Sequence, residues 1–149
     1  MAQVLGGLFD KQLGFDDRAP EPWTRHEPMT CAIYADDNGK AAALMLCDVG
    51  LAAYAGAALV LLPPTKAAPC AEGGYIDDEL LENFHEVANV ASALFNADGA
   101  PRVHLRELLS PPVDFPLDVR PLLVAPFARL HLDLNIEGYG KGRVVLLAA

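Results

Sequence analysis

The sequence predicts an α+β domain in which helices pack on an antiparallel sheet, and three stretches carry this prediction. Residues 76–95 have the apolar spacing of an amphipathic helix, residues 129–136 alternate apolar and polar side chains, and Asn38-Gly39 separates two apolar runs. Hairpins occur in place of regular strand–helix–strand units, which is typical of the α+β class. We expect one domain over residues 1–149, because this length suits a single hydrophobic core.

The N-terminal region is expected to form one helix and then a connection. Apolar residues from Val4 to Leu13 have helical spacing, and Gly14 would end the helix. Residues 15–28 are largely polar and contain three prolines, which predicts an irregular connection.

A hairpin and a buried helix are predicted next. Residues 29–34 and 41–46 are apolar runs, and the Asn-Gly turn between them tolerates positive φ, so we expect two antiparallel strands. Asp48 can cap a following helix that extends to Leu62 and is apolar almost all round. The proline and glycines at 69–74 predict a loop after it.

The best specified element is a helix over residues 77–97. Asp77 is a good N-cap, and Gly99 and Pro101 would end the helix. Its helical spacing predicts one buried apolar stripe, formed by Leu80, Phe84, Val87, Ala91 and Leu94.

The C-terminal part is expected to be mainly strands. Residues 102–106 alternate as a half-buried strand should, and residues 110–126 are a proline-rich connection with a short strand at 122–125. In the strand at 129–136 the four aliphatic residues should point inward, namely Leu130, Leu132, Leu134 and Ile136, while Arg129, His131, Asp133 and Asn135 point outward. Residues 143–149 are wholly apolar after Arg143, which suits an interior strand.

Composition and charge argue against several classes of protein. A net charge of −9 without a Lys/Arg cluster opposes nucleic-acid binding. The apolar part of the longest uncharged run is shorter than the roughly 20 residues that a membrane span needs, and the N-terminus does not resemble a secretory signal, so we expect a cytoplasmic protein without membrane contact. The three cysteines form no CxxC pair and are expected to be packing residues.

The common catalytic motifs are absent from the sequence: it has no GxSxG, no phosphate-binding glycine loop and no HExxH. The four histidines are scattered, which favours surface or hydrogen-bonding roles over metal binding. The acidic pair Asp36-Asp37 with Asn38 is explained by the hairpin turn rather than by calcium.

One polar stripe remains as a candidate site. Glu82, Glu86 and Asn89 share the side of the predicted helix opposite its apolar stripe, with Ala93 below them. Acidic residues on such a face commonly serve solubility, which is the plain alternative. Asn89 favours a site, because asparagine is a poor helix former, and its amide can donate and accept hydrogen bonds at once, as the orientation of a water molecule requires.

This pattern resembles the motif of the CheC/CheX/FliY family of phosphatases, which act on the aspartyl phosphate of CheY-type response regulators. The motif is Asp or Ser, three residues, Glu, two residues, Asn, then twenty-two residues and Pro, and it reads here as Glu82, Glu86, Asn89 and Pro112. The order of elements from residue 29 onward is also similar. With a single copy of the motif, the chain is closer to CheX than to CheC. It departs from the family pattern at Glu82, at Ala93 in place of Gly, and at His85 before the glutamate.

The resemblance implies a phosphatase in which Asn89 places the attacking water and Glu86 pairs with a lysine of the phosphorylated CheY-like receiver domain, while Glu82 and Pro112 are supporting motif positions. It also implies a homodimer, no cofactor of the protein's own, and magnesium supplied by the partner regulator. The alternative is a non-catalytic module of the same fold that binds a partner in chemotaxis or flagellar signalling. A covered Glu86 and Asn89 would favour that alternative.

Overall fold

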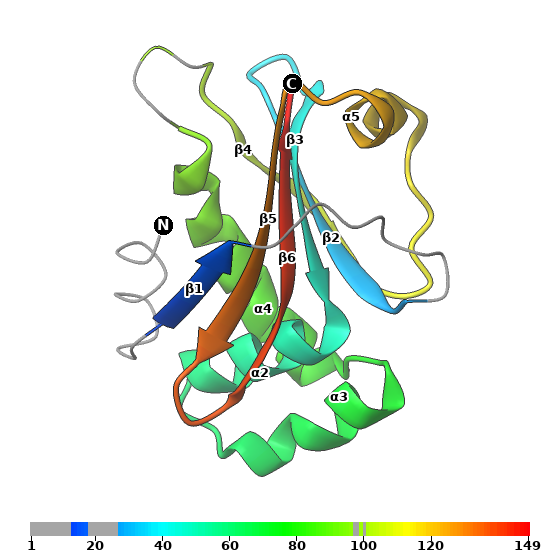
Figure 1. The fold of residues 1–149 in the computed structure, drawn as a ribbon. Coiled ribbons are helices and arrows are strands. Elements are labelled where there is room, and N and C mark those ends of the chain that lie inside the picture. Colours follow the sequence, from blue (N-terminus) through cyan, green and yellow to red (C-terminus); the bar gives the residue numbers. More distant parts are fainter. Residues whose placement is uncertain (1–12, 18–26, 97–98, 100) are drawn as a thin grey trace.

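The described residues of the computed structural model, 13–17, 27–96, 99 and 101–149, form one six-stranded sheet in which every pair of neighbours is antiparallel (Figure 1). The strand order is β1-β5-β6-β3-β2-β4. The strands are β1 (Leu13–Asp17), β2 (Met29–Ala35), β3 (Ala41–Asp48), β4 (His104–Leu109), β5 (Ala128–Ile136) and β6 (Gly140–Ala148). The predicted α+β class with an antiparallel sheet is confirmed.

The helical elements of the described residues lie in two of the connections between strands. Between β3 and β4 lie α2 (Val49–Leu59), η1 (Pro64–Lys66), α3 (Ala68–Gly73), α4 (Asp78–Ala91) and η2 (Ser92–Leu94), and between β4 and β5 lie η3 (Leu117–Val119) and α5 (Arg120–Val124). Figure 1 shows α4 and α5 on opposite sides of the strands. Within the part of the chain that the structure describes, no helix is long and apolar enough to span a bilayer.

The β2–β3 hairpin forms as its turn residues predict. Asp36 Oδ1 accepts hydrogen bonds from the backbone N–H groups of Asn38 (2.9 Å) and Lys40 (3.1 Å), and Gly39 takes a φ of +80°. That φ is costly for residues with a Cβ, so glycine allows the tight reversal. The predicted pair of antiparallel strands is therefore confirmed.

The larger core lies between the sheet and the helices α2 and α4. Asp48 begins α2 by accepting the Leu51 N–H on Oδ1 (2.8 Å), and its Oδ2 accepts the Arg143 N–H of β6 (2.7 Å). One carboxylate therefore joins the start of a helix to an interior strand. Inward residues of α2, α4 and four strands fill this core, among them Tyr34, Met45, Leu51, Phe84, Val87, Leu134 and Val144.

A second core lies on the other face of the sheet, under η3 and α5. Val119 and Leu122 are buried there against alternate residues of β2, β3 and β6, namely Cys31, Ile33, Leu44, Leu46, Val145 and Leu147. The central parts of β2, β3 and β6 are thus apolar on both faces, as strands covered on both sides require.

The sequence-based prediction of a helix end and a connection was wrong at residues 13–17, which form a strand. Leu13 and Gly14 belong to β1, which pairs with β5 from Leu13↔Ile136 to Asp17↔Leu132, so Gly14 does not end a helix and residues 15–17 are not a connection. The rest of the predicted helix, and residues 18–26 of the connection, lie outside the described residues. Backbone pairing with β5 is a tertiary effect that local spacing does not report.

Two further segments predicted as a loop and a strand are helical. The expected loop at 69–74 contains α3, which has Pro69 in its first turn and ends at Gly74 with a φ of +71°. Proline at a helix start and left-handed glycine at its end are ordinary helix boundaries, so these residues bound a helix. Residues 122–124 belong to α5, so the short strand expected at 122–125 is also wrong.

Helix α4 begins where predicted and ends earlier. Its N-cap is Asp77, but the α-helix stops at Ala91, where the Ser92 N–H donates to the Asn89 carbonyl and the chain tightens into η2. The inward and outward sides of β5 also differ from expectation at its start. Leu130 is 44% exposed and His131 is buried, whereas Leu132, Leu134 and Ile136 point inward as predicted.

Candidate functional site

Helix α4 carries the candidate site, and its N-terminus is firmly set. Asp77 Oδ1 accepts the Leu80 N–H at 2.9 Å, and its Oδ2 lies 3.7 Å from the Cys70 thiol of α3, which donates to it. Asp78 and Glu79 occupy the first turn, where negative charge is stabilised by the helix dipole. These contacts fix the start of the helix, and with it the direction in which each later side chain points.

The inward side of α4 is held by close packing. Leu80, Phe84, Val87 and Ala91 are buried, as predicted, and Leu94 is half-buried in η2. Helix α2 approaches α4 closely at Gly56, where an added Cβ would lie 2.5 Å from the Leu80 carbonyl oxygen. Only glycine permits this approach without a shift of backbone, so α4 sits in a fixed position on α2.

A buried hydrogen bond anchors the second half of α4 to the sheet. The Tyr34 hydroxyl donates to the Ala88 carbonyl at 2.7 Å, and its ring lies 5.0 Å from that of Phe95. Burial raises the pKa of this hydroxyl well above its usual range, so it remains a donor at physiological pH. This support was not foreseen from sequence, because the pattern places Tyr34 in a strand and carries no signal of its partner.

The outward side of α4 presents the predicted stripe. Glu82, Glu86 and Asn89 are all exposed, and Ala93, one turn beyond Asn89, is exposed too. Their exposure confirms the prediction that these three polar residues lie exposed together on one helix face, and their roles remain a prediction. The face is acidic, since Asp78 and Glu79 are exposed near its start.

The other positions named from the sequence lie on different elements. His85 is exposed on α4 itself, between Glu82 and Asn89 in sequence. Pro112, the last motif position, comes from a different element: it is exposed in the connection after β4, and the Pro111–Pro112 peptide bond is cis. The side chain of Asn96 joins the end of η2 to the start of β4, accepting from the Val103 N–H (2.8 Å) and donating to the Val103 carbonyl (3.1 Å).

The chemistry available on this face is positioning rather than nucleophilic attack. A carboxylate can pair with a cation, and an amide can hold a water by donating and accepting at once. Among the described residues no group of three or more His, Cys, Asp or Glu side chains gathers as metal ligands would. The three cysteines are buried, and burial raises the pKa of the Cys31 thiol to about 12, which keeps it protonated and unreactive.

Comparison with solved structures shows which proteins share this fold. The FliM middle domain from H. pylori aligns with a TM-score of 0.59 at 9% identity, over 99% of this chain and 82% of that chain. FliY from Thermotoga maritima aligns with a TM-score of 0.58 at 13% identity, over 99% and 82%. A FliM–SpeE complex from H. pylori contains a chain that aligns with a TM-score of 0.58 at 10% identity, over 99% and 81%.

No family model and no curated protein matches the sequence. At these identities the structural likeness concerns the fold alone, and at that level it confirms the CheC/CheX/FliY-type fold that the order of elements predicted.

Proposed function

We propose that this chain, which has the fold of the FliM middle domain and FliY, uses the outward face of α4 to hydrolyse the aspartyl phosphate of a CheY-like receiver domain. The observation that carries the proposal is the joint exposure of Glu82, Glu86 and Asn89 on a helix whose other side is fixed. A rigid helix holds its outward side chains in constant relation to one another, which positioning chemistry requires.

In this mechanism Asn89 orients a water molecule in line with the acyl phosphate. The water oxygen attacks phosphorus, and the bond between phosphorus and the aspartyl oxygen breaks. Inorganic phosphate leaves with the protons of the water, and the aspartate carboxylate stays on the receiver. Phosphoryl transfer of this kind depends on positioning and charge neutralisation more than on a strong base, so a neutral amide suffices. Magnesium would be held by the receiver.

Glu86 is assigned to docking. Its exposed carboxylate can pair with a lysine beside the phosphorylated aspartate of the receiver, which would set the register of the two proteins. Glu82 and Pro112 are the supporting positions, one turn before Glu86 and on the connection after β4. The acidic character of the whole α4 face favours a partner with a cationic rim.

The proposal includes a cytoplasmic location and a homodimer. The argument for the site depends on neither the location nor the dimer. Sedimentation equilibrium tests the homodimer independently of the site. A monomer at micromolar concentration would remove the dimer and leave the roles of Glu86 and Asn89 untouched.

The second candidate is a non-catalytic module that binds a partner protein. It is favoured by the likeness to FliM, one of whose matching structures is a complex with SpeE. The same exposed α4 face would then serve as a contact surface, and Asn89 would have no special chemical role. Wild-type protein that binds a receiver without releasing phosphate would establish this alternative.

Phosphate release from phosphorylated receiver domains, measured with magnesium present and at several concentrations of the protein, separates the two candidates. For a phosphatase, Glu86→Ala should weaken binding to the phosphorylated receiver as well as slow release, and wild-type binding should weaken as salt is added. Asn83→Ala, a change of the same amide on a half-buried position of α4, is the matched control and should leave catalysis intact. Inactivity of wild type on every receiver tried would exclude the phosphatase.

A further inference from the structure

The surface formed by η3, α5 and the residues that follow them exposes large apolar side chains at close intervals. Leu117, Val124 and Phe127 are 77%, 82% and 92% exposed, which makes them the three most exposed large apolar residues in the described part of the chain. All three fall within eleven residues of sequence. Isolated exposed apolar residues are normal on protein surfaces, but several together indicate a contact surface.

This surface is a fixed part of the fold. The inward side of the segment buries Val119 and Leu122 in the second core. Asp118 is clamped from the side by Arg106, whose two terminal nitrogens lie 2.6 and 3.1 Å from its carboxylate oxygens. Asp118 Oδ2 also accepts the Ala41 N–H of β3 at 3.3 Å. The exposed apolar residues therefore stand on an anchored element.

The helical spacing shows that the segment is apolar on both sides. Leu117, Pro121 and Val124 are spaced four and three apart and share one side, whereas Val119 and Leu122 are on the buried side. The exposed side of a solvated helix normally carries polar or charged residues. The exposed side of this segment carries Leu117 and Val124 instead, although Asp118 and Arg120 are also exposed.

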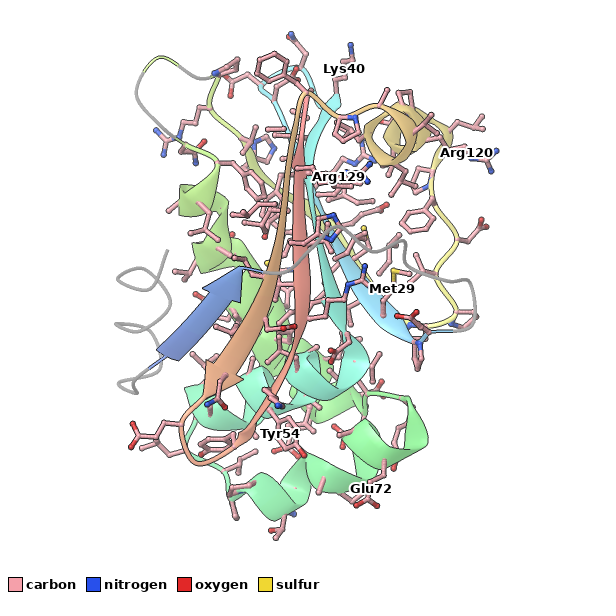
Figure 2. The ribbon with its side chains drawn as sticks, in the orientation of Figure 1. Met29, Lys40, Tyr54, Glu72, Arg120 and Arg129 are labelled. Atoms are coloured by element: carbon pink, nitrogen blue, oxygen red, sulfur yellow. The ribbon has the colours of Figure 1, made fainter. Side chains whose placement is uncertain are left out.

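The segment from residue 116 to 130 carries more positive than negative charge, although the chain carries a net charge of −9. Between residues 116 and 130 the charged residues are Asp118, Arg120 and Arg129, and Asp118 is already paired with Arg106. Figure 2 shows Arg120 pointing away from the sheet beside α5. Arg129 extends from β5 and donates to the Leu123 carbonyl at 3.5 Å. Both arginines are exposed.

We propose that Leu117, Val124 and Phe127, with Arg120 and Arg129 beside them, form a docking surface for an amphipathic helix of a partner protein whose apolar side is bordered by carboxylates. The apolar residues would take the partner's apolar side, and the arginines would pair with its acidic border. This surface is separate from the α4 face and on the other side of the sheet, so it goes beyond the proposed phosphatase.

Charge also decides against two other occupants. A second copy docked patch to patch would bring four arginines into one contact, and Asp118, the one carboxylate between residues 116 and 130, is already paired with Arg106. Anionic membranes are bound by clusters of about four to eight Lys or Arg residues, and this surface offers two arginines. An acidic amphipathic partner satisfies both the apolar side and the arginines.

The test uses two synthetic, fluorescently labelled helical peptides with the same leucine face, one bordered by glutamate and one by lysine, and follows binding by anisotropy. The overall charge of the protein favours the lysine peptide, so a preference of wild type for the glutamate peptide would come from the local arginines. Val124→Asp should weaken glutamate-peptide binding at least about tenfold, and Arg120→Glu should reverse the preference. The matched control is Val60→Asp, which changes an exposed valine at the end of α2 and should leave binding unchanged.

Four results would overturn the proposal. The first is no saturable binding of the glutamate peptide, and the second is equal binding by wild type and Val124→Asp. The third is sedimentation that shows self-association abolished by Val124→Asp, which would assign the surface to a second copy. The fourth is co-sedimentation with phosphatidylserine vesicles that the same change abolishes, which would assign it to a membrane. Circular dichroism of each variant excludes unfolding as a cause.

Discussion

Helices α4 and α5 lie on opposite sides of one sheet, and they distribute polarity in opposite ways. On α4 the buried side is apolar and the exposed side carries Glu82, Glu86 and Asn89. On η3 and α5 the buried side is also apolar, but the exposed side carries Leu117 and Val124. A polar exposed side is what any solvated helix shows, so function on α4 can be inferred only from the identity of particular residues. On α5 the lack of polarity is itself the signal.

The largest expected effect contrasts the two sides of α4. Phe84→Ala should lower the free energy of unfolding by about 3–5 kcal/mol, because it opens a cavity in the main core. Glu86→Ala, two residues away on the exposed side, should change it by less than about 0.5 kcal/mol. Urea unfolding of both variants measures the difference. Similar losses would show that the sides are wrongly assigned.

A change in α2 tests whether α4 is held by close approach. Gly56→Ala should lower the free energy of unfolding by about 1–3 kcal/mol, since the new Cβ would lie 2.5 Å from backbone of α4. The matched control is Gly50→Ala in the same helix, where the nearest neighbour is the Ala71 Cβ at 3.2 Å and a smaller loss is expected. If Gly56→Ala is as stable as Gly50→Ala, the two helices are not fixed by this contact.

Removal of one hydroxyl tests the anchor under Asn89. Tyr34→Phe should cost about 1–3 kcal/mol, because it leaves the buried Ala88 carbonyl without its 2.7 Å donor. Hydrogen exchange should then be faster for the amides of the second half of α4 than for those of its first turn. Uniform protection along the helix would mean that the hydroxyl does not hold this end.

The smallest expected effect concerns the clamp on α5. The hydrogen bonds from Arg106 hold the pKa of Asp118 below its ordinary value of 3.8. A carboxyl with a lowered pKa stabilises the fold above that ordinary value, and the contribution is lost as pH falls through the lowered pKa. Wild type should therefore exceed Asp118→Asn in stability at neutral pH by less than about 1 kcal/mol, because the pair is partly exposed and screened by solvent.

Unfolding followed from pH 7 to pH 2 measures this clamp. The gap between wild type and Asp118→Asn should close as the carboxyl becomes protonated. A gap that stays constant over this range would show that the carboxylate charge does not contribute.

The parts of the fold that local chemistry specifies could be predicted from the sequence. The β2–β3 turn depends on Asp36 and Gly39, which act within a few residues of themselves, and α4 is specified by its own N-cap and apolar spacing. The exposed stripe followed from the same spacing. In each case the residues that determine the structure lie in the segment that adopts it.

The rest depends on partners distant in sequence. Strand β1 exists through its pairing with β5, and α5 has apolar residues on both sides, so no single period marks which one is buried. His131 lies on a side that alternation predicts to be polar, yet it is buried, whereas Arg129 and Asn135 on the same side are exposed. The Tyr34 hydroxyl meets a carbonyl 54 residues away, which no local pattern reports.

The most direct test of the central claim, that the buried side of α4 maintains the fold and its exposed side performs chemistry, is one preparation of Asn89→Ala measured in two ways. Its thermal unfolding should match or slightly exceed that of wild type, because alanine is the better helix former by a few tenths of a kcal/mol. Its maximal rate of phosphate release from a phosphorylated receiver should fall with little change in affinity, since a water-orienting contact acts in the transition state. A variant that releases phosphate as fast as wild type would contradict the claim.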